Sequence, residues 1–124
     1  MTGSWYHSSL SGQGFELQVL ATNPPSLLAT WFTFLPQGGP TWMTGTGPIA
    51  GDAAVVQAYQ VNGPGAVFPN YVVTPDTTPQ FWGTLTFTFT DCSHGYVDYD
   101  AAQPYGSGSL SIERLTLPAG LACP

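Results

Sequence analysis

The first and last parts of this chain carry the residues that most constrain its fold. Trp5 lies near the N-terminus, and Arg114, the only cationic side chain, lies near the C-terminus. A guanidinium is planar and stacks on aromatic rings, and Arg114 alternates in phase with the apolar Leu110 and Ile112, so it is expected to point toward the core. A tryptophan on the first strand and an arginine on the last can meet only if the sheet closes. We therefore predict a closed antiparallel barrel fastened by Trp5 and Arg114.

Apolar and polar residues alternate in several segments, which is the pattern of β-strands. The clearest is 83–91, where leucine and phenylalanine occupy one face and threonines the other; 14–19 and 109–117 alternate in the same way. Turn signals separate the segments, and no convincing amphipathic helix is found. About eight strands close a barrel whose interior holds side chains or one small ligand. The prediction is an all-β, eight-stranded antiparallel up-and-down barrel, a single domain over residues 1–124.

The middle of the chain contains the remaining strands and one long irregular stretch. Residues 26–35 are apolar on both faces, so something must cover the outside of that strand. Further strands are expected over 41–49 and 53–61. Residues 62–79 are rich in proline and glycine; they are expected to hold a short strand at 66–73 and are long enough to act as a lid.

Composition excludes several classes of partner. Only 6% of the residues are charged, lysine is absent and the net charge is −6. Nucleic acids and anionic membranes need a basic patch, so neither is an expected partner. No apolar run is long enough to span a bilayer. With 43% hydrophobic residues the chain is nevertheless expected to fold.

Cys92 and Cys123 are the only cysteines. In a small, weakly charged domain they are best interpreted as one disulfide, which would stabilise the fold by roughly 3–4 kcal/mol; two buried free thiols are the alternative. A disulfide indicates an oxidising compartment, so the protein is expected to be secreted or periplasmic. The sequence carries no signal peptide, and Met1-Thr2 is expected to be an added start on a mature or excised domain.

Gly3-x-Trp5 with an inward-facing Arg114 on the final strand resembles the signature of the calycins, which include lipocalins and avidin-like barrels. The resemblance implies that Arg114 packs over Trp5 and seals one end of the barrel. The avidin-like branch fits best, because Gly3-Ser4-Trp5-Tyr6 is followed by a short turn and GFELQV. The last strand lacks the tryptophan-rich lid segments expected of a biotin binder.

A second resemblance spans nearly the whole chain. The motifs that carry it are Gly3-x-Trp5-Tyr6, Gly12-x-Gly14-Phe15, Trp31-Phe32-Thr33-Phe34, Gly39-x-x-Trp42, Gly45-x-Gly47, Asp91-Cys92 and Arg114-Leu115-Thr116 with a terminal cysteine. Together they are similar to a bacterial exported domain, found alone or appended to larger secreted proteins, that has no established activity. The resemblance implies export and the disulfide and implies nothing about function.

Two groups of polar residues are candidates for reactive sites. Asp91, His94, Asp98 and Asp100 could hold a metal, but their spacing is not that of a calcium loop, and a solvated outer face is favoured. We expect no metal and no cofactor.

His7 with Ser8 or Ser9 could be imagined as a hydrolase site. Adjacent strand residues point in opposite directions, and no G-x-S-x-G elbow occurs, so we expect a protein that is not an enzyme.

The chain has more aromatic residues than a narrow barrel needs, and three interpretations are open: core with an outer apolar belt, an aromatic-lined mouth for a small apolar or sugar-like ligand, or an exposed patch for a partner. We favour the mouth, at the barrel end opposite the clasp. The expected ligand contacts are Trp31, Trp42, Tyr59, Phe81 and Trp82. The alternative is an accessory module that binds a protein, or a second copy, through an apolar outer face over 26–46. Aromatic rings that point into the barrel mouth would favour ligand binding, and rings that point outward from 26–46 would favour a protein partner.

Overall fold

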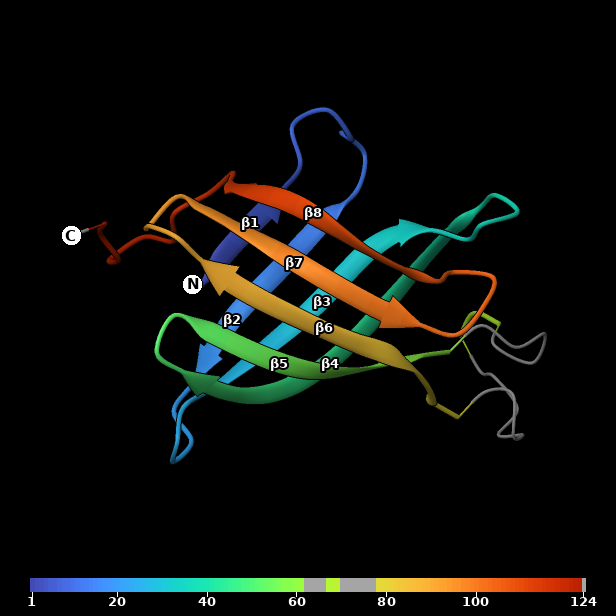
Figure 1. The fold of residues 1–124 in the computed structure, drawn as a ribbon, viewed down its shortest axis with the longest axis horizontal. Coiled ribbons are helices and arrows are strands. Elements are labelled where there is room, and N and C mark those ends of the chain that lie inside the picture. The colour runs from blue at the N-terminus through green and yellow to red at the C-terminus, as the bar shows by residue number, and fades with distance from the viewer. Residues whose placement is uncertain (62–66, 70–77, 124) are drawn as a thin grey trace.

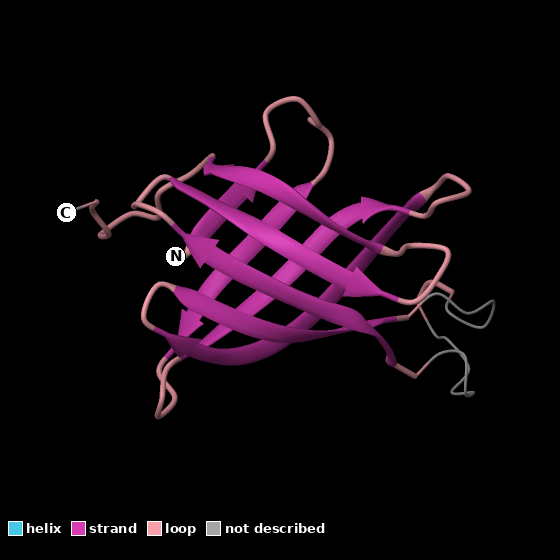
Figure 2. Cartoon of the chain, viewed as in Figure 1, coloured by secondary structure: helices cyan, strands magenta, loops and turns pink. Residues whose placement is uncertain are grey.

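The computed structural model describes residues 1–61, 67–69 and 78–123, and it is a closed barrel of eight strands (Figures 1 and 2). Every strand is antiparallel to its neighbours in sequence, and β8 returns to pair with β1. No helix occurs among the described residues. The predicted eight-stranded up-and-down barrel is therefore confirmed. The strands are β1 (Gly3–Tyr6), β2 (Gly14–Leu20), β3 (Ser26–Phe34), β4 (Pro40–Ala50), β5 (Ala53–Gln60), β6 (Gln80–Phe89), β7 (His94–Ala101) and β8 (Ser107–Arg114).

The two ends of the barrel differ in what surrounds them (Figure 1). Both chain termini and the turns β2–β3, β4–β5 and β6–β7 lie at one end, which we call the clasp end. The turns β3–β4 and β7–β8 and the last residues of β5 lie at the other, the mouth end. The long stretch expected over 62–79, with its short strand and lid, falls mostly outside the described residues.

The barrel interior is filled by the inward faces of the strands. On β6, Leu85, Phe87 and Phe89 are buried while the threonines between them are partly exposed, as the alternation predicts. The ring of Phe15 stacks on Trp31 at 5.0 Å between centroids and meets Phe87 edge-on at 5.3 Å. The centre is therefore a packed core rather than an open channel.

A close approach of β4 and β5 depends on glycine. A Cβ atom at Gly47 would lie 1.7 Å from the backbone oxygen of Val55, and one at Gly45 would lie 1.8 Å from that of Gln57. No side chain fits at either position, so these glycines allow the two strands to pack this closely where the wall curves.

An irregularity in the β5–β6 ladder decides which way two aromatic residues point. Ala58 pairs with Gly83, but the next residue, Tyr59, pairs with Phe81, so Trp82 is an extra residue in a β-bulge. Without the bulge Trp82 would share the outward face of Thr84. With it, Trp82 is buried and Phe81 is exposed.

Candidate functional site

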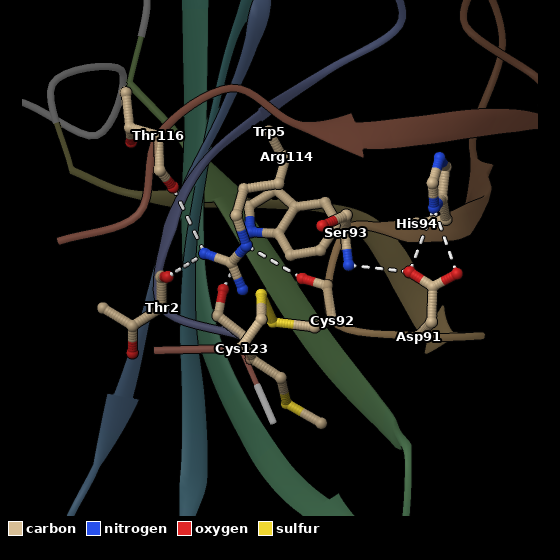
Figure 3. The surroundings of a disulfide bond; sticks show 10 residues. Thr2, Trp5, Asp91, Cys92, Ser93, His94, Arg114, Thr116 and Cys123 are labelled. Carbon is tan, nitrogen blue, oxygen red and sulfur yellow. Dashed lines mark hydrogen bonds and ion pairs between the residues drawn. A yellow bond between two sulfur atoms is a disulfide. The ribbon is translucent and has the colours of Figure 1, made fainter. Parts of the chain in front are cut away.

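The clasp end is sealed by a contact between the first and last strands. Trp5 and Arg114 are paired in the β1–β8 ladder, and the Arg114 guanidinium carbon lies 4.6 Å from the centroid of the Trp5 ring (Figure 3). Arg114 Nε donates to the Cys92 carbonyl at 2.8 Å, and Nη1 donates to the carbonyls of Thr2 at 2.6 Å and Thr116 at 3.2 Å. Trp5 Nε1 donates to the Met1 carbonyl at 2.8 Å. The arrangement is structural, because these hydrogen bonds from Arg114 and Trp5 all go to backbone carbonyl oxygens.

The disulfide meets the clasp at one residue. Cys92 and Cys123 are joined, with their Cα atoms 5.6 Å apart, which confirms the predicted pairing (Figure 3). The carbonyl of Cys92 is also the acceptor for Arg114 Nε. The C-terminal tail, the β6–β7 turn and β8 are therefore held together at the clasp end.

Gly3 is the third part of the clasp. Its φ is +138°, and a Cβ there would lie 2.5 Å from the Thr116 carbonyl oxygen and 2.8 Å from Arg114 Nη1. A side chain at this position would occupy the space through which Arg114 reaches its acceptors. The Gly3-x-Trp5 motif therefore has a steric explanation.

The five expected ligand contacts do not form one site. Trp31 and Trp82 are 7% exposed and point into the barrel at the mouth end, where their rings meet edge-on at 5.8 Å. Trp42, Tyr59 and Phe81 point outward. The reason for Trp42 is strand alternation: its neighbour Met43 is buried, so Trp42 must take the opposite face. The expected site thus divides into an interior part and an exterior part.

The interior part is a cavity of about 190 Å³ at the mouth end. Its aromatic lining is Trp31, Phe34, Trp82, Tyr99 and Tyr105. Tyr99 follows from the alternation of β7, whereas Tyr105 lies in the β7–β8 turn, where no sequence pattern indicates its direction.

One polar atom of this lining is unusual. Trp82 Nε1 is buried and has no hydrogen-bond partner among the described residues. Nearby, the nearly buried Gln60 donates from Nε2 to Thr41 Oγ1 and to the Tyr105 hydroxyl, each at 3.0 Å. No charged side chain contributes to the described lining of the cavity. The described lining of the mouth cavity is therefore aromatic and uncharged, and it includes Trp82, whose buried N–H is unpaired among the described residues.

The exterior part of the expected site adjoins a groove that the sequence does not predict. This groove is larger than the mouth cavity. Two cavities of about 350 and 290 Å³ lie against the outside of β1–β4 and share Gly12 and Phe32. The loop between β1 and β2, which stands away from the barrel in Figure 1, forms one wall. We call these two adjacent cavities the outer groove. The position of this loop depends on tertiary contacts, so the alternation of apolar and polar residues in the sequence does not predict the groove.

The polar residues around Asp91 and His7 form hydrogen bonds near the ends of strands. His94 Nδ1 lies 3.0 Å from Asp91 Oδ1, and the Ser93 backbone N–H donates to the same oxygen at 2.7 Å. These contacts, the backbone N–H first, lower the pKa of Asp91 below its ordinary value. His7 Nδ1 contacts the Ser111 carbonyl oxygen at 2.7 Å.

The described residues contain no group of three or more histidine, cysteine or carboxylate side chains placed to hold a metal ion. Asp100 accepts a hydrogen bond from Ser107 Oγ at 2.7 Å on the outside of the barrel.

Comparison with protein-family models, curated protein sequences and solved structures finds no match for this chain. Within the described ranges, no helix is long and apolar enough to cross a membrane. The fold and the clasp define the class of structure: a closed eight-stranded antiparallel barrel, sealed at one end by an arginine–tryptophan contact and a disulfide.

Proposed function

We propose that this protein is an exported, non-catalytic binding module whose barrel mouth takes one small uncharged molecule. The observation that carries the proposal is the buried indole N–H of Trp82, which has no hydrogen-bond partner among the described residues and belongs to a side chain that lines the mouth cavity. A buried donor without a partner costs about 1–3 kcal/mol. A ligand that brings an acceptor oxygen or nitrogen to this atom offsets that cost.

The volume of the cavity and the charge of its lining restrict the class of ligand further. Its volume of about 190 Å³ is below the roughly 300–1,000 Å³ typical of pockets for drug-sized molecules, so the fit is to a single ring. The described lining has no charge that would pair with an ionic ligand. A sugar ring or a small flat apolar compound with a hydrogen-bond acceptor meets these requirements.

Two further observations support the wider proposal. The Cys92–Cys123 disulfide supports export, because such bonds persist mainly in oxidising compartments. The contact of Arg114 with Trp5 at 4.6 Å supports kinship with the calycin barrels. The His94–Asp91 pair lies at the clasp end, away from the mouth, and therefore has no part in the proposed site.

The test is a binding screen with glucose, N-acetylglucosamine, phenol and indole, read by thermal shift and by tryptophan fluorescence. Trp82→Phe keeps a ring but removes the N–H, and we expect it to weaken binding of acceptor-bearing compounds about tenfold, which corresponds to about 1.4 kcal/mol. Tyr96→Phe, at an exposed ring on the outside of β7, is the control and should bind normally. Equal binding by wild type and Trp82→Phe, or no thermal shift with any compound, would reject the mouth as the site.

A further inference from the structure

The outside of the barrel carries a row of exposed aromatic residues, of which only Phe34 also lines the mouth cavity. We call this surface the outer aromatic face; its members are exposed by 42–57% and are Phe32, Phe34, Trp42, Tyr59 and Phe81. Phe32 is directly opposite Trp42 in the β3–β4 ladder, and Tyr59 is opposite Phe81 in the β5–β6 ladder. The Tyr59 and Phe81 rings meet edge-on at 5.8 Å between centroids.

The two aromatic pairs adjoin each other. Tyr59 is opposite Thr44, and Trp42 is two residues from Thr44 on the same face, so Trp42 and Tyr59 are diagonal neighbours. Because neighbouring strands lie about 4.8 Å apart, a row that crosses from β3 to β6 extends for about 14 Å. The rings thus form a strip rather than isolated contacts.

The described residues around this strip carry almost no charge. In the described residues from the start of β3 to the end of β6, the only charged side chain is Asp52, in the β4–β5 turn at the clasp end. The polar groups on this side are hydroxyls and amides instead. Thr30 and Thr44 hydrogen-bond to each other at 3.0 Å, and Thr84 donates to Gln57 Oε1 at 3.4 Å.

The outer groove continues the strip. Its 290 Å³ part is lined by Phe32, Phe34 and Trp42, and its 350 Å³ part extends past Phe32 to Tyr6 and Glu16. Glu16 is the only charged lining residue among those described, and it accepts a hydrogen bond from Ser4 Oγ. A carboxylate at this end and the lack of any cation disfavour an anionic occupant.

The geometry points to an uncharged polysaccharide strand, lying along the outer groove and stacked on the outer aromatic face. The C–H faces of sugar rings are apolar and fit aromatic faces, while their hydroxyls suit the threonine and glutamine groups beside the rings. This ligand also matches the absence of charge on the face.

A protein occupant fits less well. On the outer aromatic face the strands β3 to β6 are paired with one another, so a protein must bind there through side chains alone. Five rings that each bury about 150–250 Å² when covered, and that are already about half covered, leave roughly 400–600 Å² to bury. A stable protein interface needs about 800 Å² on each partner. The exposed apolar area is therefore better matched to a narrow chain.

The experiment is affinity electrophoresis of the intact protein in gels containing hydroxyethylcellulose, glucomannan or xylan, with pull-down on insoluble cellulose and chitin. We expect retardation by at least one neutral polymer and none by alginate or heparin. Trp42→Ala and Phe81→Ala should each weaken retention at least tenfold. Trp82→Phe, which alters only the mouth, should leave retention unchanged, so this inference and the mouth proposal fail separately.

Trp42→Leu separates stacking from simple apolar contact. It keeps an apolar side chain but removes the flat ring, so polysaccharide binding should be lost with it, whereas a protein contact would largely survive. Light scattering after gel filtration checks for self-association. A dimer that Trp42→Asp dissolves, preferential binding to alginate or heparin, or no retention by any neutral polymer while circular dichroism shows a folded protein, would each overturn the inference.

Discussion

The guanidinium of Arg114 lies 4.6 Å above the ring centroid of Trp5, although the two residues stand at opposite ends of the sequence. Arg114 also donates hydrogen bonds to the carbonyls of Cys92, Thr2 and Thr116, which belong to three separate segments. One side chain therefore ties together the N-terminus, the β6–β7 turn and the chain that follows β8. Several predictions concern this end of the barrel.

Arg114→Ala should lower the free energy of unfolding by about 2–4 kcal/mol, because it leaves three carbonyl oxygens without this donor and uncovers the Trp5 ring. Arg114→Lys should recover little of the loss, since an ammonium lacks the plane that stacks and the fork that reaches several acceptors. Urea denaturation of the three proteins measures this. An unchanged midpoint for Arg114→Ala would show that the contact contributes nothing to stability.

Gly3→Ala should destabilise the barrel by about 2–3 kcal/mol, because the added methyl group meets the Thr116 carbonyl and Arg114 Nη1. Gly38→Ala is the matched control: Gly38 also has a positive φ, of +105°, but a Cβ there meets nothing within 4 Å. The control should show only the smaller cost of the backbone conformation. If both variants melt alike, crowding at the clasp is not the reason for glycine at position 3.

Cys92 and Cys123 should give no free thiol in the unfolded, unreduced protein. Cys123→Ser should lower the free energy of unfolding by roughly 3–4 kcal/mol, since the bond restricts the unfolded chain between two points 31 residues apart. A thiol assay in denaturant and a thermal melt with and without reductant measure both effects. Two reactive thiols would contradict the disulfide and weaken the proposal of export.

The bulge in β6 predicts opposite effects for two adjacent aromatic residues. Trp82→Ala should cost about 3–5 kcal/mol because it empties a buried position, whereas Phe81→Ala should stay within about 1 kcal/mol because its ring is largely exposed. Phe87→Ala, fully buried on the same strand, serves as the reference for a core position. A larger loss for Phe81→Ala than for Trp82→Ala would mean that the bulge is misplaced.

Asp91 should titrate below its ordinary pKa, because the Ser93 N–H and then His94 favour its charged form. The folded pKa is depressed, so the stabilisation is present above the unfolded pKa, near 3.9, and is lost as the pH falls through the folded value. NMR titration of the Asp91 side chain measures the pKa directly. Asp91→Asn should make stability less sensitive to acid, and an ordinary pKa at this carboxyl group would contradict the hydrogen bonds.

Much of the architecture followed from local patterns. The alternation in 83–91 predicts β6 because successive strand residues must face opposite sides, and Leu85, Phe87 and Phe89 are indeed buried. The closed barrel was predicted from the inward phase of Arg114 and the position of Trp5, and it is confirmed. The pairing of the cysteines needed no further information, because only two are present.

Side-chain period and residue type thus predict the strand pattern and the closure, and the two cysteines leave only the choice between one disulfide and two free thiols. The directions of the additional aromatic side chains, by contrast, depend on the packing of the whole barrel. A single extra residue at the β-bulge turns Trp82 inward and Phe81 outward, and nothing in the local pattern marks that shift. The β1–β2 loop likewise creates the outer groove, and Tyr105 reaches the mouth from a turn. The positions of bulges and loops depend on the packing of the whole barrel. Their residues do not alternate regularly, so the sequence does not predict which way their side chains point.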